Sequence, residues 1–179
     1  MCKLQSRRIE NCLPLIPISV NISRKSLFEP NVVEIYKEIA DSYGIDTKYI
    51  PIEITENLAL TNKKIKPIAD RFFDAGFELQ MDDFGSGESA LNALNMMHFT
   101  VVKIDKSLID FIGEKNGDLI LNHAMALGKE LGVKLVAEGV ETIKQLCFLR
   151  EHNCDLIQGY YFSKPLPQEE FEAKLDANP

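Results

Sequence analysis

The sequence has no cysteine pattern typical of a disulfide framework or a zinc site. Its four cysteines, Cys2, Cys12, Cys147 and Cys154, show no C-x-x-C spacing, which favours reduced thiols in a cytoplasmic protein. A zinc site built on Cys147, His152 and Cys154 would need a fourth ligand, and none stands at a suitable spacing. We therefore interpret the histidines as structural residues.

The sequence also lacks a long apolar run and a block of positive charge. No segment reaches the ~18 apolar residues that a membrane-spanning helix requires, and residues 1–13 lack the apolar core of a signal peptide. Lysines and arginines are spread along the chain, and the formal net charge is −7, which argues against a DNA or RNA polymer as partner. We expect a cytoplasmic protein without membrane contact in this segment. An acidic protein that handles phosphates would recruit metal cations to do so.

At 179 residues and 45% hydrophobic content, the chain is long enough for one large core and short for two domains. Six short β-type runs alternate with helix-type segments, which predicts an α/β fold with a parallel sheet. The predicted strands are residues 17–23, 50–56, 77–84, 100–107, 133–140 and 155–162.

Apolar residues at helical spacing predict one buried face in each of three segments, and each segment ends on a glycine, a typical helix terminator. Pro67 falls in the first turns of the second segment, where proline is tolerated. Further helices are expected at 2–12, 141–153 and 167–177. The expected buried faces are Val33, Ile35, Tyr36, Ile39 and Ala40 in 29–44, Ile65, Ile68, Ala69, Phe72 and Phe73 in 62–76, and Leu119, Ile120, Ala124, Leu127 and Leu131 in 117–132.

Polar side chains occur at the carboxyl end of every predicted strand. Strands of a parallel sheet are buried on both faces, so polar groups there cost several kcal/mol unless they are paired or bind metal. Because the carboxyl ends of parallel strands lie at one edge, and in a barrel at one mouth, we expect these side chains to converge. In chain order they are Asn21, Glu53, Glu56, Asp82, Asp83, Lys103, Asp105, Glu138, Glu141 and Gln158.

Each of these residues also has a simpler interpretation. Segment 82–87, with two aspartates and two glycines, has the composition of an ordinary turn. Asn21 and Glu56 fit helix caps, and Glu141 fits the positive end of a helix. Lys103 could pair with a single acid. Capping explains single positions, but six successive strand ends of this kind favour a shared site.

The strand ends offer hard oxygen ligands, which select Mg²⁺ or Mn²⁺ over zinc. Two such cations bridged by a carboxylate, with a lysine beside them, are suited to in-line attack of water on a phosphodiester. The oxygen ligands would come from Asn21, Glu53, Asp82, Asp83 and Glu138.

Six motifs, in this order and at these separations, make the sequence resemble the EAL-domain family of cyclic di-GMP phosphodiesterases. They are SVNIS, EITE, DDFGSG, KIDKS, AEGVE and QGYYFSKPLP. The resemblance covers essentially all of residues 1–179. It implies a TIM-type (β/α)8 barrel that uses two divalent cations to hydrolyse one bond of the bacterial second messenger cyclic di-GMP, giving linear pGpG.

Carried over to these positions, the resemblance implies that Asn21, Glu53 and Asp82 hold one cation. Asp82 would bridge to a second cation held through Asp83 and Glu138.

The resemblance also implies roles for residues beside the cations. Lys103 would orient or deprotonate the attacking water, and Gln158 would hold a metal-bound water or the substrate phosphate. Lys103, Glu138 and Gln158 form the implied catalytic group. Glu56 would anchor the DDFG loop from behind. The residues assigned to the substrate and this loop are Glu56, Gly85, Gly87 and Glu141.

The sequence departs from the family pattern in several places. It has no Glu-Ala-Leu motif, whose glutamate is a metal ligand in the family, and it begins with what reads as the end of a large helix, 2–12. We therefore expect an incomplete domain over 1–179, an N-terminally truncated barrel of about six βα units without the first two strands. Glu88 stands where the family usually has an aromatic residue, and the approach to Lys103 is also atypical.

Two expectations follow from these departures. The missing glutamate should leave this chain alone weakly active, and the alternative is an inactive EAL-type module that binds cyclic di-GMP or a protein partner. The sheet should be open, with 17–23 and 155–162 as unpaired edges that favour a homodimer, borrowed strands or aggregation.

Overall fold

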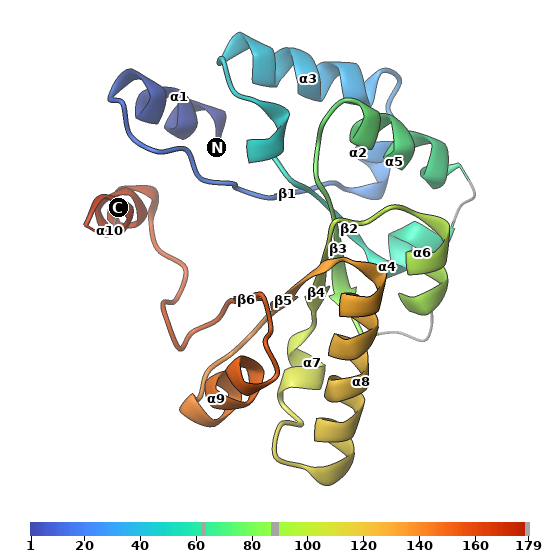
Figure 1. Ribbon diagram of the computed structural model, residues 1–179. Coiled ribbons are helices and arrows are strands. Elements are labelled where there is room, and N and C mark those ends of the chain that lie inside the picture. The colour runs from blue at the N-terminus through green and yellow to red at the C-terminus, as the bar shows by residue number, and fades with distance from the viewer. Residues whose placement is uncertain (62–63, 87–89, 178–179) are drawn as a thin grey trace.

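The computed structural model describes residues 1–61, 64–86 and 90–177. Over these residues the chain forms a six-stranded parallel sheet whose strands neighbour each other in chain order. Figure 1 shows the strands at the centre of the molecule with helices around them. All six predicted strands are confirmed in position and direction. They are β1 (Val20–Asn21), β2 (Ile52–Thr55), β3 (Leu79–Phe84), β4 (Val101–Ile104), β5 (Lys134–Ala137) and β6 (Leu156–Ile157).

Helices connect the strands, as parallel pairing requires. Five of the six predicted helical segments each contain one of the longer helices, and the sixth, 117–132, overlaps a helix that begins two residues earlier. The helices of the described residues are α1 (Cys2–Glu10), α2 (Arg24–Leu27), α3 (Val32–Ser42), α4 (Glu56–Thr61), α5 (Ile65–Asp74), α6 (Ala90–Met96), α7 (Lys106–Ile109), α8 (Lys115–Leu131), α9 (Ile143–Glu151) and α10 (Gln168–Asp176), with a 3₁₀ turn at Thr47–Tyr49.

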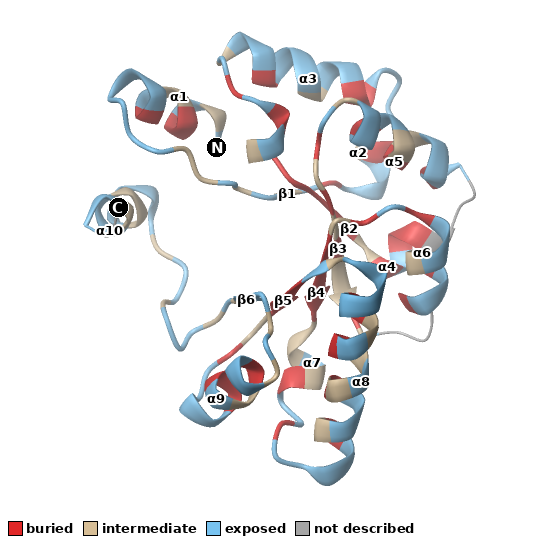
Figure 2. Ribbon diagram, viewed as in Figure 1, coloured by how far each residue is buried: buried red, intermediate tan, exposed pale blue. Residues whose placement is uncertain are grey.

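The core lies between the sheet and the inner faces of the helices, where Figure 2 shows the buried residues. Ile52, Ile54 and Ile104 on the inner strands have no exposed surface. These β-branched residues suit strands that are covered on both faces. Asn21 lies opposite Glu53 in the strand register, and Thr55 lies opposite Asp82. The register therefore brings the polar ends of neighbouring strands together.

The sheet is open within the described residues, because β1 pairs only with β2 and β6 only with β5. This α/β architecture agrees with the expected truncated TIM-type barrel, and the expected edges are its edges. The two terminal helices meet beside the opening (Figure 1), where Arg7 lies 2.6 Å from Glu172 and Arg8 lies 2.9 Å from Asp176. Among all the residues that the structure describes, no helix is long and apolar enough to cross a membrane.

The predicted inner face of α8 is wrong at three of its five positions, while Ala124 and Leu127 are partly buried. Leu119, Ile120 and Leu131 are each more than half exposed, and the helix instead buries Gly117, Leu121, Met125 and Gly128. The reason is close packing: a Cβ at Gly128 would lie 2.6 Å from Cδ2 of Leu135 on β5. The prediction treated only apolar side chains as candidates for burial and did not consider glycine.

The predicted faces of α3 and α5 are right at their centres and wrong at their margins. Val33 and Ala40 are buried on α3, whereas Ile35 and Ile39 are close to half exposed. On α5, Phe73 is also close to half exposed. The residues confirmed as buried on α5 are Ile65, Ala69 and Phe72.

Candidate active site

β3 ends in a local irregularity that carries the two neighbouring aspartates. Its register with β4 shifts between Met81 and Phe84, and Asp83 has a left-handed backbone with φ of 61°. The Asp83 N–H donates to Oδ1 of Asp82 at 3.1 Å. A bulge of this kind interrupts the alternation of a strand and redirects side chains. The side chains of Asp82 and Asp83, although neighbours in sequence, can therefore both contribute to a site at the end of β3.

Gly85 lets the chain turn directly after these aspartates. Its φ is +95°, and a Cβ there would lie 2.2 Å from Cδ1 of Leu108. The backbone conformation favours glycine, and a larger residue would also displace the Leu108 side chain. Gly87 and Glu88, which belong to the same predicted loop, lie outside the described residues.

Lys103 on β4 is the centre of the strand-end cluster. Its Nζ lies 3.0 Å from Oε1 of Glu53 on β2, 2.9 Å from Oδ1 of Asp82 on β3 and 2.8 Å from Oε1 of Glu138, which follows β5. All four side chains are largely buried. The expectation that Lys103 could pair with a single acid is therefore too simple, because one ammonium joins carboxylates from three other strand ends.

The electrostatics of the cluster follow from this sharing. Burial opposes the charge of Lys103, but hydrogen bonds to Glu138, Asp82 and Glu53 outweigh it and raise the pKa of Lys103 above its usual range. Burial raises the pKa of Glu138, and its ion pair with Lys103 opposes that shift. The pKa of Lys103 is thus raised by its acid partners, whereas that of Glu138 is raised by burial. Burial, with the charges of Asp82 and Asp105, also raises the pKa of Asp83.

Three further predicted residues lie around the cluster. Asn21 is exposed at the end of β1, beside Glu53 in the register. Gln158 follows β6, and its Nε2 donates to Oε1 of Glu138 at 3.4 Å. Glu56 is completely buried as the first residue of α4. The structure thus brings Gln158 into contact with the cluster and buries Glu56 one residue beyond β2.

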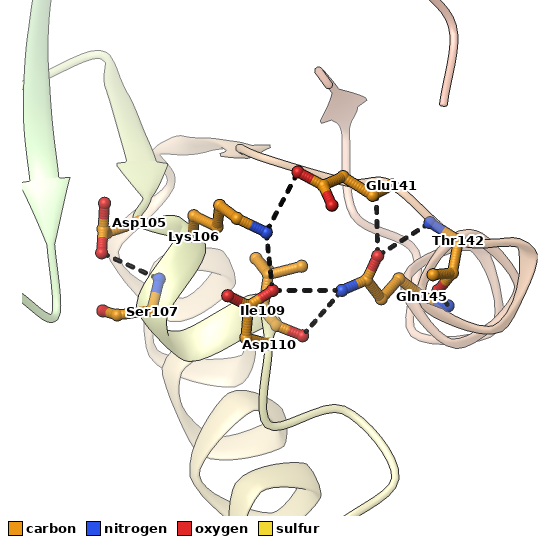
Figure 3. Close-up of polar contacts among 8 residues, drawn as sticks. All are labelled: Asp105, Lys106, Ser107, Ile109, Asp110, Glu141, Thr142 and Gln145. Atoms are coloured by element: carbon orange, nitrogen blue, oxygen red, sulfur yellow. Dashed lines mark hydrogen bonds and ion pairs between the residues drawn. The ribbon is translucent and has the colours of Figure 1, made fainter. Parts of the chain in front are cut away.

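Glu141 belongs to a different network (Figure 3). Its carboxylate lies 3.3 Å from Nζ of Lys106, and its N–H donates to Oε1 of Gln145 at 2.9 Å. Glu141 lies directly before Thr142, the N-cap of α9, which begins at Ile143. The simpler interpretation, a position at the positive end of a helix, therefore also fits its place. Glu141 and Gln158 both line an open groove of about 980 Å³ that extends from the β5 and β6 ends to α10.

The sequence interpretation missed the residues that hold this network together. Gln145 is one of the few buried polar side chains, and it forms a capping box with Thr142. The T-x-x-Q spacing of 142–145 was a readable signal for that box. Nothing in the spacing indicated that Gln145 also contacts the end of α7 or that Lys106 contacts Glu141.

The donor set of the strand ends suits Mg²⁺ or Mn²⁺ in kind, because it consists of carboxylate and amide oxygens. As they stand, the described residues contain no group of three or more His, Cys, Asp or Glu side chains arranged to hold a metal ion. The positive charge at the centre of the cluster is the ammonium of Lys103. The residues fit a divalent cation by chemistry, and Glu53, Asp82, Asp83 and Glu138 are those that would hold it, with Asn21.

A family model for the EAL domain matches residues 1–165. The chain belongs to the EAL domain family. It is 36% identical over 154 residues to the probable cyclic di-GMP phosphodiesterase PdeB of Escherichia coli strain K12, with 86% of this chain and 29% of PdeB covered. The chain spans less than a third of the length of the curated relatives it matches first.

Solved EAL domains have the same fold. The EAL domain of Mycobacterium smegmatis DcpA has a TM-score of 0.91 and 29% identity, with 98% of this chain and 80% of that chain covered. A manganese and cyclic di-GMP complex of Klebsiella pneumoniae BlrP1 has a TM-score of 0.83 and 27% identity, with 92% and 43% covered. A divalent metal and this dinucleotide therefore occur together in a member of the fold.

Proposed function

We propose that the strand-end cluster is a phosphodiesterase site for cyclic di-GMP, which yields linear pGpG. The observation that carries this proposal is the contact of Lys103 with Glu53, Asp82 and Glu138, from three other strand ends, at 2.8 to 3.0 Å. A structural ion pair needs one acid, whereas a site for a phosphodiester needs several carboxylates to hold cations and a positive group beside them. The complexes of relatives with cyclic di-GMP support the choice of substrate.

The residues divide into those that hold cations and those that act on water and substrate. Asn21, Glu53 and Asp82 would hold one cation, and Asp82, Asp83 and Glu138 would hold the other. When bound, two divalent cations would neutralise phosphate charge and make water a stronger nucleophile.

Lys103 orients the attacking water, because its ammonium lies among the carboxylates that surround the reaction centre. The other expected role, deprotonation of that water, does not fit an ammonium whose pKa is raised above its usual range by hydrogen bonds to three acids. Gln158 holds the phosphate or an ordered water from the groove side, and its amide reaches Glu138 at 3.4 Å. Glu56 and Gly85 support the loop after β3, and Glu141 lines the open groove beside Gln158.

The incomplete ligand set limits the expected rate. The sequence contains no Glu-Ala-Leu motif, and losing one charged metal ligand should cost orders of magnitude in turnover. We propose an EAL-type phosphodiesterase domain over 1–179 that is weakly active in this chain by itself. The second candidate is an inactive module that binds cyclic di-GMP or a protein partner, and the same missing glutamate favours it.

Turnover and binding separate the two candidates. The purified chain is incubated with cyclic di-GMP and Mn²⁺, and the products are resolved by chromatography, while calorimetry measures dinucleotide binding. Slow, Mn²⁺-dependent formation of pGpG that Lys103→Ala abolishes supports the phosphodiesterase. Binding without any pGpG supports the inactive module, and neither binding nor product contradicts both.

A further inference from the structure

Two short segments follow the strands whose side chains meet at the cluster. α7 begins at Lys106, three residues after Lys103, and loop 138–142 leads from β5 to α9. Nζ of Lys103 and Oε1 of Glu138 are 2.8 Å apart, the shortest of the three Lys103 ion pairs. Because both residues lie close to these segments in sequence, a shift of loop 138–142 against α7 would change this contact.

Gln145 joins the two segments through its side chain (Figure 3). Its Oε1 accepts the backbone N–H groups of Glu141 and Thr142, both at 2.9 Å. Its Nε2 lies 3.5 Å from the carbonyl oxygen of Ile109 and 3.5 Å from Oδ1 of Asp110, at the end of α7. The side chain is only 8% exposed, so an unmade hydrogen bond here is not replaced freely by water.

Lys106 makes a second connection between the same segments. Its Nζ lies 2.8 Å from Oδ1 of Asp110 and 3.3 Å from Oε1 of Glu141. Its aliphatic stem covers Gly139, where an added Cβ would lie 2.6 Å from Cβ of Lys106. Gly139 directly follows Glu138, so the contact reaches the residue next to the cluster.

Backbone hydrogen bonds extend this connection to the site residues. The Glu138 N–H donates to the Ile104 carbonyl at 3.0 Å, and the Val140 N–H donates to the Gln158 carbonyl at 3.1 Å. The loop that Gln145 and Lys106 hold is therefore also bonded to β4 and to Gln158. Its first residue, Glu138, and its middle residue, Val140, are thus bonded to the strand ends that carry the cluster.

We propose that Gln145 and Lys106 are positioning residues, which fix loop 138–142 against α7 and thereby set Glu138 and Gln158 relative to Lys103. The proposal rests on the proposed function only where it makes Glu138 a functional residue. We call the contacts of Gln145 and Lys106 with loop 138–142 and α7 the bridge, and the bridge can be tested without measuring turnover.

The sharpest variant breaks the bridge and keeps the helix cap. Gln145→Glu retains an oxygen for the N–H groups of Glu141 and Thr142 but cannot donate to α7 from a carboxylate. Lys106→Met retains the apolar stem over Gly139 and removes both ion pairs. Thr142→Ala is the matched control, because it weakens the cap of α9 and leaves the bridge intact.

Hydrogen exchange of the backbone amides measures how firmly loop 138–142 is held, because an amide exchanges when its hydrogen bond opens. We expect Gln145→Glu and Lys106→Met to speed exchange at Glu138 and Val140 about tenfold, as for the loss of a supporting interaction. Thr142→Ala should speed exchange in the first turn of α9 and leave Glu138 and Val140 unchanged. A second ion-pair control is Lys66→Met on α5, where Lys66 makes the same i,i+4 contact with Asp70 at 2.9 Å.

Mn²⁺ affinity by calorimetry is the functional readout. The bridge variants should weaken Mn²⁺ binding severalfold, while Thr142→Ala and Lys66→Met bind as the unchanged chain does. Unchanged exchange at Glu138 and Val140 in both bridge variants would overturn the proposal, as would equal changes in Thr142→Ala. If the unchanged chain does not bind Mn²⁺, the proposed function fails and the exchange result still decides the role of the bridge.

Discussion

Replacing Lys103 by methionine should strongly destabilise the fold. Methionine keeps the length and apolar stem of the side chain but removes the ammonium that contacts Glu53, Asp82 and Glu138. The three carboxylates then lie close together, largely buried and without their shared cation. Removing one partner of a buried ion pair typically costs about 3–5 kcal/mol of unfolding free energy. That is a large share of the ~5–15 kcal/mol that stabilises a typical protein.

Urea unfolding followed by circular dichroism at neutral pH measures this loss. A change of this size corresponds to a drop of roughly 10 °C in melting temperature for a domain of this length. Adding Glu138→Gln to Lys103→Met should recover part of the loss, because it removes one of the three opposed charges. Lys66→Met, which breaks an exposed ion pair with Asp70, should cost less than about 1 kcal/mol.

The result that refutes this reasoning is a Lys103→Met variant as stable as the unchanged chain. Equal stability would mean that the three carboxylates do not need the charge of Lys103, because protonation or hydration of the carboxylates replaces it. Failure of Glu138→Gln to restore any stability would show that the loss comes from packing and not from charge.

Three further outcomes follow from the fold. Gly85→Ala should cost about 1–3 kcal/mol in urea unfolding, because of its positive φ and its contact with Leu108; an unchanged midpoint contradicts this. Gly128→Ala should cost about 1–3 kcal/mol through overpacking against Leu135, and a more stable variant would show that the Leu135 side chain yields freely. The unpaired edges β1 and β6 should cause self-association in size-exclusion chromatography with light scattering, and a monodisperse monomer with an ordinary melting temperature contradicts that.

The sheet could be predicted from the sequence because its strands are short β-branched runs separated by helical periodicity. Since parallel strands end at one edge, the positions of Glu53, Asp82, Lys103 and Glu138 in the sequence also predicted their convergence. β3 to β6 repeat the parallel pairing of β1 with β2, so the order of strands in the sheet is their order in the chain. The contact distances around Lys103 agree with that convergence.

Three features could not be predicted in this way. The inner face of α8 depends on Gly117 and Gly128, whose burial reflects the closeness of neighbouring backbone and Leu135 and leaves no apolar signal. The bridge through Gln145 depends on the distance between α7 and α9, which is set by the sheet and not by local sequence. Residue type alone also could not tell that Lys103 would be shared by three acids.

Calorimetric titration of Mn²⁺ into the purified chain tests the central claim most directly, because the claim requires the strand-end carboxylates to bind divalent cations. The unchanged chain should bind Mn²⁺, and Asp82→Asn and Asp83→Asn should each weaken binding at least tenfold, about 1.4 kcal/mol, by removing a charged ligand. Asp70→Asn, which removes an exposed charge on α5, should leave the affinity unchanged. Equal Mn²⁺ binding by the unchanged chain and all three variants, or no binding at all, would contradict the account.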